Sequence, residues 1–322
     1  MAMESKYIWM NGVMVPFEKA TLHFLTPALH YGAAVFEGIR AYETPKGTAV
    51  FRLREHIERL FDSARVFGFR EIPWTVDQIC EATKQTVKAN EFKDCYIRPL
   101  LYLDEGGWNL TVDAGKPSLA IAVWQWANYL GEEALAKGIR ANISSFTRHH
   151  PNVMMTKAKV TGNYANSFLA KTESMRLGFD EAIMLDPQGY VAECTGENLF
   201  VVRNGRVITP STAPVLEGIT RQSIFTIATD LGYQVIEQPV SRDQLYIADE
   251  VFVCGTAAEC VGLSEIDFRK IGEGKTGPIT RAIQKVFHEA IHGKVAKYES
   301  WCDYVDVSQS IKLSLDADAP LA

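Results

Sequence analysis

Two lysines stand one residue apart in the stretch MMTKAKVTGNYANS, residues 154–167. If this segment is extended, Lys157 and Lys159 point to the same face, because side chains in a strand alternate with a period of two. Paired lysines usually mark a solvated edge. In apolar surroundings, however, a lysine amine is more easily kept unprotonated, and it can then attack a carbonyl. The spacing alone decides neither between these interpretations nor between the two lysines.

A carboxylate interrupts a second apolar stretch, GYVAECTGENLFVV. Glu193 lies in a predicted strand, close to Val191 and Cys194. Burying an unpaired carboxylate is costly, so Glu193 either points to solvent or has a cationic partner.

Three further segments could hold an anion. In LEGITRQSIF, the predicted helix starts at Ile219-Thr220, where backbone N–H groups attract negative charge, although an ordinary helix start looks the same. In DEVFVCGTAAE, the residues Gly255-Thr256-Ala257 either allow a ligand close to the backbone or form a plain turn. Arg59, within REHIERLFDSARVF, is a surface charge unless a phosphate lies nearby.

Tyr96 and Arg98 alternate around Ile97 in the predicted strand CYIRPLLYLD. They therefore face the same side and together could receive a carboxylate. The alternative is an aromatic and cationic pair on a solvated sheet face.

The elements that position these residues follow from hydrophobic periodicity. The first half shows a two-strand signal around Asn11-Gly12, and the second half shows a hairpin, further strands and no strict alternation of strand and helix. We expect an α+β fold with two helices on the first sheet. The expected helices cover residues 52–69, 75–92, 163–177 and 219–232, and the expected strands cover 49–53, 95–104, 118–126, 140–146, 181–186, 190–195 and 199–205.

Composition excludes several classes of function. The chain has 322 residues, 47% of them hydrophobic, and a formal net charge of −6, which argues against a nucleic-acid partner. The longest apolar run is too short for a membrane span, and no secretory signal is recognised, so we expect a cytoplasmic protein without a membrane partner. Six scattered cysteines indicate neither disulfides nor zinc, and RHHPN at 148–152 has no third ligand, so no metal is predicted.

Taken together, the motifs resemble the class IV, fold type IV, pyridoxal 5'-phosphate aminotransferases. The resemblance is carried by K-x-x-G-N-Y from Lys159, A-E-x-x-x-E-N-L-F from Ala192, G-I-T-R from Gly218 and G-T-A-A-E from Gly255. Within that class, HYGAAVFEGIRAY, REHIERL and YIRPL are similar to the branched-chain amino acid aminotransferases. The likeness extends over about residues 5–300 and implies a two-domain fold like that of D-amino-acid aminotransferase, with the active site at the domain interface.

The domains expected on this basis are a smaller α+β domain at 1–127, with the substrate side and the phosphate-binding arginine, and a larger cofactor-binding domain at 139–305. A linker at 128–138 and a mobile acidic tail at 306–322 complete the chain.

The resemblance also assigns roles to residues of both predicted domains. It implies that Lys159, not Lys157, forms the Schiff base with the cofactor and acts as acid and base. Tyr164 matches the tyrosine at the cofactor's phenolic oxygen, and Glu193 the glutamate at the pyridine nitrogen. The phosphate would be held by Arg59, Ile219, Thr220 and Thr256.

The implied substrates are L-leucine, L-isoleucine and L-valine, with 2-oxoglutarate as acceptor in a ping-pong mechanism. Arg98 is the candidate for the glutamate side-chain carboxylate. The residues implied in substrate binding are Tyr31, Phe36, Gly38, Tyr96, Arg98, Trp108, Trp126, Tyr129, Thr256 and Ala257.

One loop departs from the family pattern, at Gly106-Gly107-Trp108 within 104–115. Because this loop reaches a partner subunit's pocket in the family, a homodimer or higher homo-oligomer is implied, and the substrate range depends on Trp108. Rival activities on the same scaffold are those of a D-amino-acid or (R)-amine transaminase and an aminodeoxychorismate lyase. A catalytically idle cofactor-binding regulator is the rival from another class, although the lysine and glutamate whose loss would signal it are both present.

Overall fold

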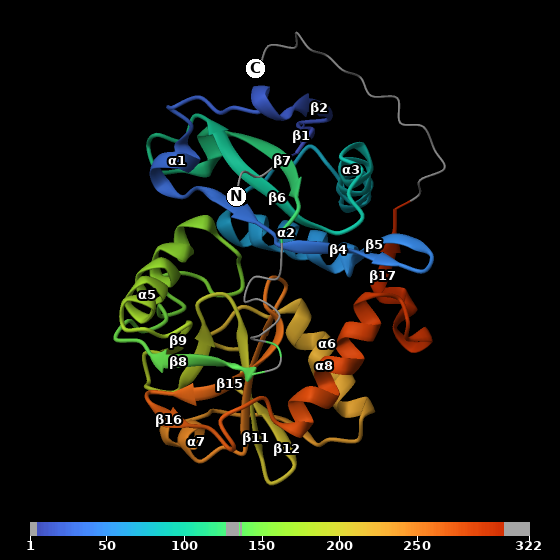
Figure 1. The fold of residues 1–322 in the computed structure, drawn as a ribbon. Coiled ribbons are helices and arrows are strands. Elements are labelled where there is room, and N and C mark those ends of the chain that lie inside the picture. Colours follow the sequence, from blue (N-terminus) through green and yellow to red (C-terminus); the bar gives the residue numbers. More distant parts are fainter. Residues whose placement is uncertain (1–4, 127–134, 136, 306–322) are drawn as a thin grey trace. The chain divides into compact units, whose positions relative to one another are not determined.

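The computed structural model describes residues 5–126, 135 and 137–305 (Figure 1). The chain forms two compact units. Of the described residues, the first unit contains 5–126, Ala158–Gly162 and 290–305, and the second contains 135, 137–157 and 163–289. The predicted larger domain, 139–305, includes the segment Ala158–Gly162 and the segment that begins at Ala290, which both belong to the first unit. The predicted domain boundaries remain a prediction. The predicted tail and all of the predicted linker except residues 135, 137 and 138 lie outside the described residues.

The first unit is built on one antiparallel sheet with the strand order β17-β5-β4-β6-β7-β1-β2, and β3 pairs with β6. Its strands are β1 (Tyr7–Met10), β2 (Val13–Pro16), β3 (Ala34–Phe36), β4 (Ile39–Thr44), β5 (Gly47–Phe51), β6 (Cys95–Glu105), β7 (Lys116–Trp124) and β17 (Cys302–Tyr304). The expected two-strand signal is the β1–β2 hairpin, whose Asn11 and Gly12 both have positive φ, as a tight hairpin turn requires.

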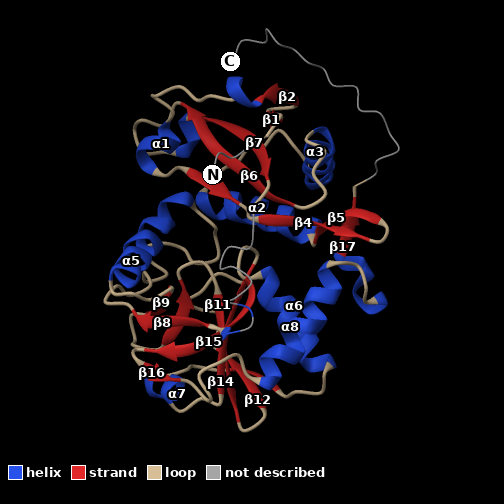
Figure 2. Cartoon of the chain, in the orientation of Figure 1, coloured by secondary structure: helices blue, strands red, loops and turns tan. Residues whose placement is uncertain are grey.

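Two amphipathic helices cover this sheet, as expected (Figure 2). The helix α2 (Leu53–Phe67) contacts α3 (Val76–Ala89) and β3, and α3 contacts β1, β6 and β7. Leu53, Ile57, Leu60 and Ala64 recur at helical spacing along α2 and are fully buried in the core. A capping box between Thr75 and Gln78 starts α3, which satisfies N–H groups of its first turn. The shorter α1 (Pro27–Tyr31) precedes β3.

The second unit contains a mixed sheet with the order β10-β9-β8-β15-β14-β11-β12-β13, and β16 pairs with β15. The pairs β8–β9, β8–β15 and β12–β13 are parallel, and the others are antiparallel. The strands are β8 (Ile139–Ile143), β9 (Glu181–Leu185), β10 (Val191–Cys194), β11 (Asn198–Arg203), β12 (Arg206–Thr209), β13 (Val235–Glu237), β14 (Glu250–Gly255), β15 (Glu259–Ile266) and β16 (Arg269–Lys270).

The helices of the second unit are α5 (Tyr164–Arg176), α6 (Ile219–Asp230) and α7 (Arg242–Tyr246), while α8 (Pro278–Ile291) ends within the first unit. The expected helices at 163–177 and 219–232 correspond to α5 and α6. The helix α8 was not among the expected helices. The α+β class is confirmed by these two sheets and their helices. Among the described residues, no helix combines the length and the apolar character that a membrane crossing requires.

Candidate functional site

Lys159 belongs to the first unit, where its short segment runs beside β3. Its N–H donates to Ser63 Oγ at 3.0 Å, and its carbonyl accepts from the Phe36 N–H at 3.0 Å. Val160, the next residue, forms a bridge with Val35. The Lys159 Nζ lies 4.8 Å from the centre of the Phe36 ring. The backbone thus holds a partly buried amine beside an apolar ring, which is a setting suited to a nucleophilic lysine.

Lys157 has a different environment, because the chain turns at Thr156–Lys157 instead of running as a strand. The exposed Lys157 belongs to the second unit, where its Nζ lies 3.0 Å from Glu217 Oε1 and donates to the carbonyls of Thr212 and Val215. The shared face that an extended segment would produce is therefore absent from this stretch. Lys157 is thus bonded to the loop that precedes α6.

Arg59, on α2, is paired with a buried carboxylate that the sequence analysis overlooked. Its Nε and Nη2 donate to Glu37 Oε1 and Oε2 at 2.7 and 2.8 Å, and His56 Nδ1 lies 2.7 Å from Oε2. Burial alone would raise the pKa of Glu37, but the charge of Arg59 and the hydrogen bonds from His56 and Arg59 hold that pKa well below its usual range. The apolar run AVFEGI contained the same signal that singled out Glu193.

Tyr96 and Arg98 meet on one side of β6, as their alternation predicts. Arg98 Nη2 donates to Tyr96 Oη at 3.0 Å, and the guanidinium carbon lies 4.6 Å from the centre of the Phe36 ring. Arg98 Nε is buried and has no hydrogen-bond partner among the described residues. Trp126 lies edge-on to Tyr96, with ring centres 4.7 Å apart. The aromatic wall also includes Trp124, 5.8 Å from the Arg98 guanidinium, which the sequence analysis did not single out.

Glu193 is buried on β10, so it is not the outward-facing residue that the sequence left open. Its cationic partner within the chain is Arg148, whose Nε donates to Glu193 Oε1 at 2.8 Å. Asn198 Nδ2 donates to Glu193 Oε2 at 3.2 Å and to the carbonyl of Leu216 at 3.1 Å. These two partners fix the carboxylate, and neither was identified from the sequence.

Asn198 also brings the start of α6 close to Glu193. Ile219 and Thr220 are buried as the first two residues of the helix, and its N-cap Gly218 has no side chain that could cap it. A Cβ added to Gly218 would lie 2.0 Å from Asn198 Oδ1, so any other residue here would displace the Asn198 amide. The predicted anion-binding helix start and the predicted carboxylate are therefore neighbours in the second unit.

Two other predicted positions lie at element ends of the second unit. Tyr164 is the first residue of α5 and is partly buried. Thr256 and Ala257 occupy the tight connection between β14 and β15, where a Cβ on Gly255 would lie 3.1 Å from the carbonyl of Gly196. The backbone around Thr256 is thus packed closely against the segment that follows β10. Tyr129, another predicted substrate residue, lies outside the described residues.

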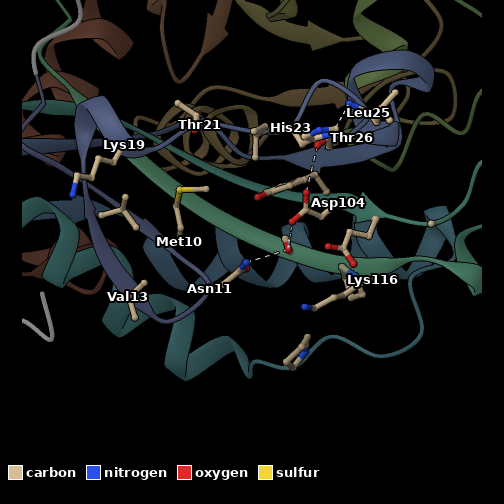
Figure 3. A pocket seen from close by; sticks show the side chains of 18 of the residues that line it. Met10, Asn11, Val13, Lys19, Thr21, His23, Leu25, Thr26, Asp104 and Lys116 are labelled. Atoms are coloured by element: carbon tan, nitrogen blue, oxygen red, sulfur yellow. Dashed lines mark hydrogen bonds between the residues drawn. The ribbon is translucent and has the colours of Figure 1, made fainter. Parts of the chain in front are cut away.

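Tyr31 and Trp108 form a separate, more exposed aromatic group in the first unit. Their rings meet edge to face with centres 5.6 Å apart, and the side chains are 48% and 45% exposed. Trp108 also lines a cavity of about 1020 Å³, part of which Figure 3 shows. In that wall Asp104 accepts hydrogen bonds from Thr26 at 3.4 Å and Ser118 at 3.1 Å. Of the predicted site residues that the structure describes, only Trp108 lines this cavity. The cavity is therefore not the one into which Lys159 would present its amine.

Comparison with known proteins agrees with this set of side chains. Residues 34–266 match the sequence profile of the family described as Amino-transferase class IV. A branched-chain-amino-acid aminotransferase of Pseudomonas aeruginosa is 47% identical over 301 residues, which cover 94% of this chain and 98% of that protein.

Two solved structures of the T.th. branched-chain amino acid aminotransferase are each 46% identical and cover 95% of this chain and all of theirs. One, complexed with 4-methylvaleric acid, superposes with a TM-score of 0.90. The other, complexed with N-(5'-phosphopyridoxyl)-L-glutamate, superposes with a TM-score of 0.89. The profile match and these relatives show that the chain belongs to the class IV aminotransferases and, within that family, to the branched-chain-amino-acid aminotransferases.

Proposed function

We propose that this enzyme uses pyridoxal 5'-phosphate to transfer the amino group of L-leucine, L-isoleucine or L-valine to 2-oxoglutarate. The products are branched 2-keto acids and L-glutamate, formed in a ping-pong sequence. Support comes from the relatives named for branched-chain amino acids and from the solved relative complexed with a phosphopyridoxyl derivative of L-glutamate.

The side chains present fit this cofactor. Pyridoxal phosphate has an aldehyde, a phosphate and a basic ring nitrogen, and the chain offers a matching group for each. Lys159 supplies an amine held beside an apolar ring. Arg59 supplies a guanidinium held by a buried carboxylate. Glu193 supplies a buried carboxylate for the ring nitrogen. The start of α6 lies close by, and its helix dipole would favour the phosphate.

When bound, the cofactor supplies the carbonyl that exchanges for the amino group and the ring that withdraws electrons from the substrate's Cα. Within the chain, Lys159 Nζ would link to the cofactor and move the proton to and from Cα. Glu193 would keep the ring nitrogen protonated, and Tyr164 would hydrogen-bond the phenolic oxygen. Arg59, Ile219, Thr220 and Thr256 would hold the phosphate.

The observation that carries the substrate assignment is the partly buried Arg98, whose Nε is covered, within its aromatic wall. The unpartnered Nε and the Nη2 bonded to Tyr96 provide donors for an acid group, while Phe36, Tyr96 and Trp126 provide apolar surface. Such a wall suits branched aliphatic side chains, and the guanidinium suits the second carboxylate of glutamate. Thr256 and Ala257 are proposed to receive the substrate's α-carboxylate through their backbone.

We propose in addition that the enzyme is a cytoplasmic homodimer or higher homo-oligomer. The exposed aromatic pair Tyr31 and Trp108 supports this proposal, because large exposed apolar side chains that cluster often mark a contact surface. In such an assembly Trp108 would complete the substrate pocket of the partner subunit.

The test is a panel of amino donors with 2-oxoglutarate as acceptor, followed by detection of L-glutamate and of the keto product by mass spectrometry. We expect the three branched-chain L-amino acids to give the highest kcat/KM. A higher value for D-alanine or an (R)-amine would assign the enzyme to one of the rival transaminases. Release of pyruvate from aminodeoxychorismate would indicate the lyase, and cofactor binding without turnover would indicate a regulator.

A further inference from the structure

Glu37 is a fully buried charged residue in the connection between β3 and β4. Its N–H donates to the carbonyl of Pro99 on β6 at 3.0 Å. The preceding residue, Phe36, is tied to Lys159 through a backbone hydrogen bond and through its ring. The backbone of Glu37 thus belongs to the same hydrogen-bonded frame as the proposed cofactor-linking lysine.

The carboxylate of Glu37 holds Arg59 in a two-pronged arrangement. Oε1 accepts from Nε at 2.7 Å, and Oε2 accepts from Nη2 at 2.8 Å. Two parallel bonds of this kind fix the plane and the direction of a guanidinium, and a single bond does not. The side chain of Arg59 is 15% exposed, whereas Glu37 is completely covered. The carboxylate therefore binds the guanidinium from the side that faces the protein interior.

His56 is the second anchor of this carboxylate. It lies one helical turn before Arg59 on α2, so both side chains emerge on the same face of the helix. Burial lowers the pKa of His56 despite the opposing effect of Glu37, so at neutral pH a neutral imidazole donates from Nδ1 to Oε2. The group then contains one negative charge and one positive charge. Removing the negative charge takes away the carboxylate that holds this largely covered guanidinium.

The same helix face also meets the lysine segment. Ser63 follows Arg59 by four residues on α2 and accepts the hydrogen bond from the Lys159 N–H. The segment that carries Lys159 and the group that holds Arg59 are therefore anchored to adjacent turns of α2. A shift of the guanidinium within this frame would change its distance from any ligand attached to the lysine.

We propose that Glu37 is a positioning residue for cofactor binding: its carboxylate, anchored by His56, sets the orientation in which Arg59 meets the phosphate of pyridoxal 5'-phosphate. This inference rests on the proposed function and extends it. It assigns to Glu37, a completely covered residue, the role of orienting the arginine that is proposed to bind the phosphate.

The test compares two probes that differ by the phosphate, pyridoxal 5'-phosphate and pyridoxal, in absorbance titrations of the apoprotein. We expect Glu37→Gln, which has nearly the same size but no charge, to raise the dissociation constant for pyridoxal phosphate about 10- to 100-fold, as for loss of one charge-assisted contact. The dissociation constant for pyridoxal should change less than about twofold. Asp77→Asn is the matched control. It removes an exposed carboxylate that pairs with Arg54, another arginine of α2, and it should affect the binding of neither probe.

A double-mutant cycle separates positioning from a general loss of structure. If Glu37 acts through Arg59, Glu37→Gln in an Arg59→Gln background should add less than a twofold change in pyridoxal phosphate affinity. Equal weakening of both probes, or fully additive effects, would refute the inference.

Glu37→Asp retains the charge but is one methylene too short to reach both guanidinium donors. If Glu37→Gln does not fold, the affinities for pyridoxal phosphate and pyridoxal are compared in Glu37→Asp instead. Unchanged pyridoxal phosphate affinity in a folded Glu37 variant would also refute the inference while leaving the proposed function intact. A wild-type protein that binds no pyridoxal phosphate would instead refute the proposed function.

Discussion

At the scale of single residues, the two buried carboxylates Glu37 and Glu193 each have a cationic partner within their own unit. Glu37 and Arg59 form a forked ion pair, and Glu193 accepts bonds from Arg148 and Asn198. The sequence indicated that a buried Glu193 needs a cation, and the family resemblance offered the cofactor ring for that role. The structure adds a guanidinium from the chain itself. Such compensation makes a buried carboxylate tolerable before any ligand is bound.

The first prediction concerns the two lysines. Lys159→Ala should abolish multiple-turnover transamination and the cofactor link that borohydride traps, because no other amine is held beside Phe36 among the described contacts. Lys157→Ala should keep the link, because the Nζ of Lys157 is engaged with Glu217. Mass spectrometry of the trapped peptides is the measurement. Cofactor found on the peptide's Lys157 would overturn the assignment.

The second prediction concerns the buried carboxylate. Glu193→Gln should retain bound pyridoxal phosphate but reduce kcat by roughly 10²–10⁴, because an amide cannot keep the ring nitrogen protonated. Cofactor content is read from absorbance and kcat from keto-acid formation. Glu217→Gln, which removes a half-exposed carboxylate, is the control and should leave kcat within about twofold. Near wild-type turnover in Glu193→Gln would mean that another residue manages this nitrogen.

At the scale of elements, α2 and the connection from β3 to β4 organise the first unit's part of the site. His56, Arg59 and Ser63 follow one another at helical spacings of three and four, so one helix face supplies all three. The connection between β3 and β4 contains Glu37 and Gly38. Its close contact with Tyr96 shows why the second position is glycine: a Cβ there would lie 2.1 Å from Tyr96 Oη.

The third prediction follows from that contact. Gly38→Ala should destabilise the protein by about 1–3 kcal/mol, because the methyl group forces Tyr96 out of place. It should also raise the KM for branched-chain substrates. Urea unfolding measures the first effect and steady-state kinetics the second. Gly196→Ala is the control, since its added Cβ meets no described atom within 4 Å apart from those of its chain neighbours. Removing the hydroxyl in Gly38→Ala/Tyr96→Phe should recover part of the stability, and no recovery would place the strain elsewhere.

At the scale of the whole molecule, acid sensitivity is expected from His149. Burial, with a smaller effect of the Arg148 charge, lowers the pKa of His149 from 6.5 to about 4. The unfolded chain therefore binds more protons between these values, so this contribution to stability is complete above pH 6.5 and is lost as the pH falls toward 4.

The fourth prediction tests this contribution. His149→Gln should reduce the loss of unfolding free energy between pH 6.5 and 4 by about 1–2 kcal/mol, after allowance for partial exposure of the imidazole. Denaturant unfolding at several pH values is the measurement, and His150→Gln, at the exposed neighbouring position, is the control. An identical pH profile for wild type and His149→Gln would show that other groups account for the acid sensitivity.

The fifth prediction concerns assembly. If Trp108 completes the pocket of a partner subunit, Trp108→Ala should lower kcat/KM for leucine and isoleucine roughly tenfold or more, from the loss of about 1.5–3 kcal/mol of side-chain burial. Cofactor binding should be unchanged, and glutamate should be less affected because its second carboxylate is assigned to Arg98. Hybrids of Trp108→Ala and Lys159→Ala chains should regain one intact site per dimer. Recovery no greater than that from leftover homodimers would show that the loop serves its own chain.

Local elements and the family could be predicted from the amino-acid sequence. The β1–β2 hairpin, α2, α3, α5 and α6 were predictable because their signals are short-range: turn residues with positive φ and apolar side chains at fixed spacing. The ordered motifs identified the class IV aminotransferases because cofactor chemistry requires those residue types. The alternation of Tyr96 and Arg98 around Ile97 likewise predicted that they share one strand face, as they do.

Which charges meet could be seen only in the folded chain. Glu37 and Arg59 are 22 residues apart, and Arg148 and Glu193 are 45 apart, so no local pattern links either pair. The fold likewise places a turn at Thr156–Lys157, which sends neighbouring lysines to different surroundings. Long-range pairs of this kind depend on how strands and helices pack, because a buried charge is stable only where packing brings its counterion within hydrogen-bonding distance.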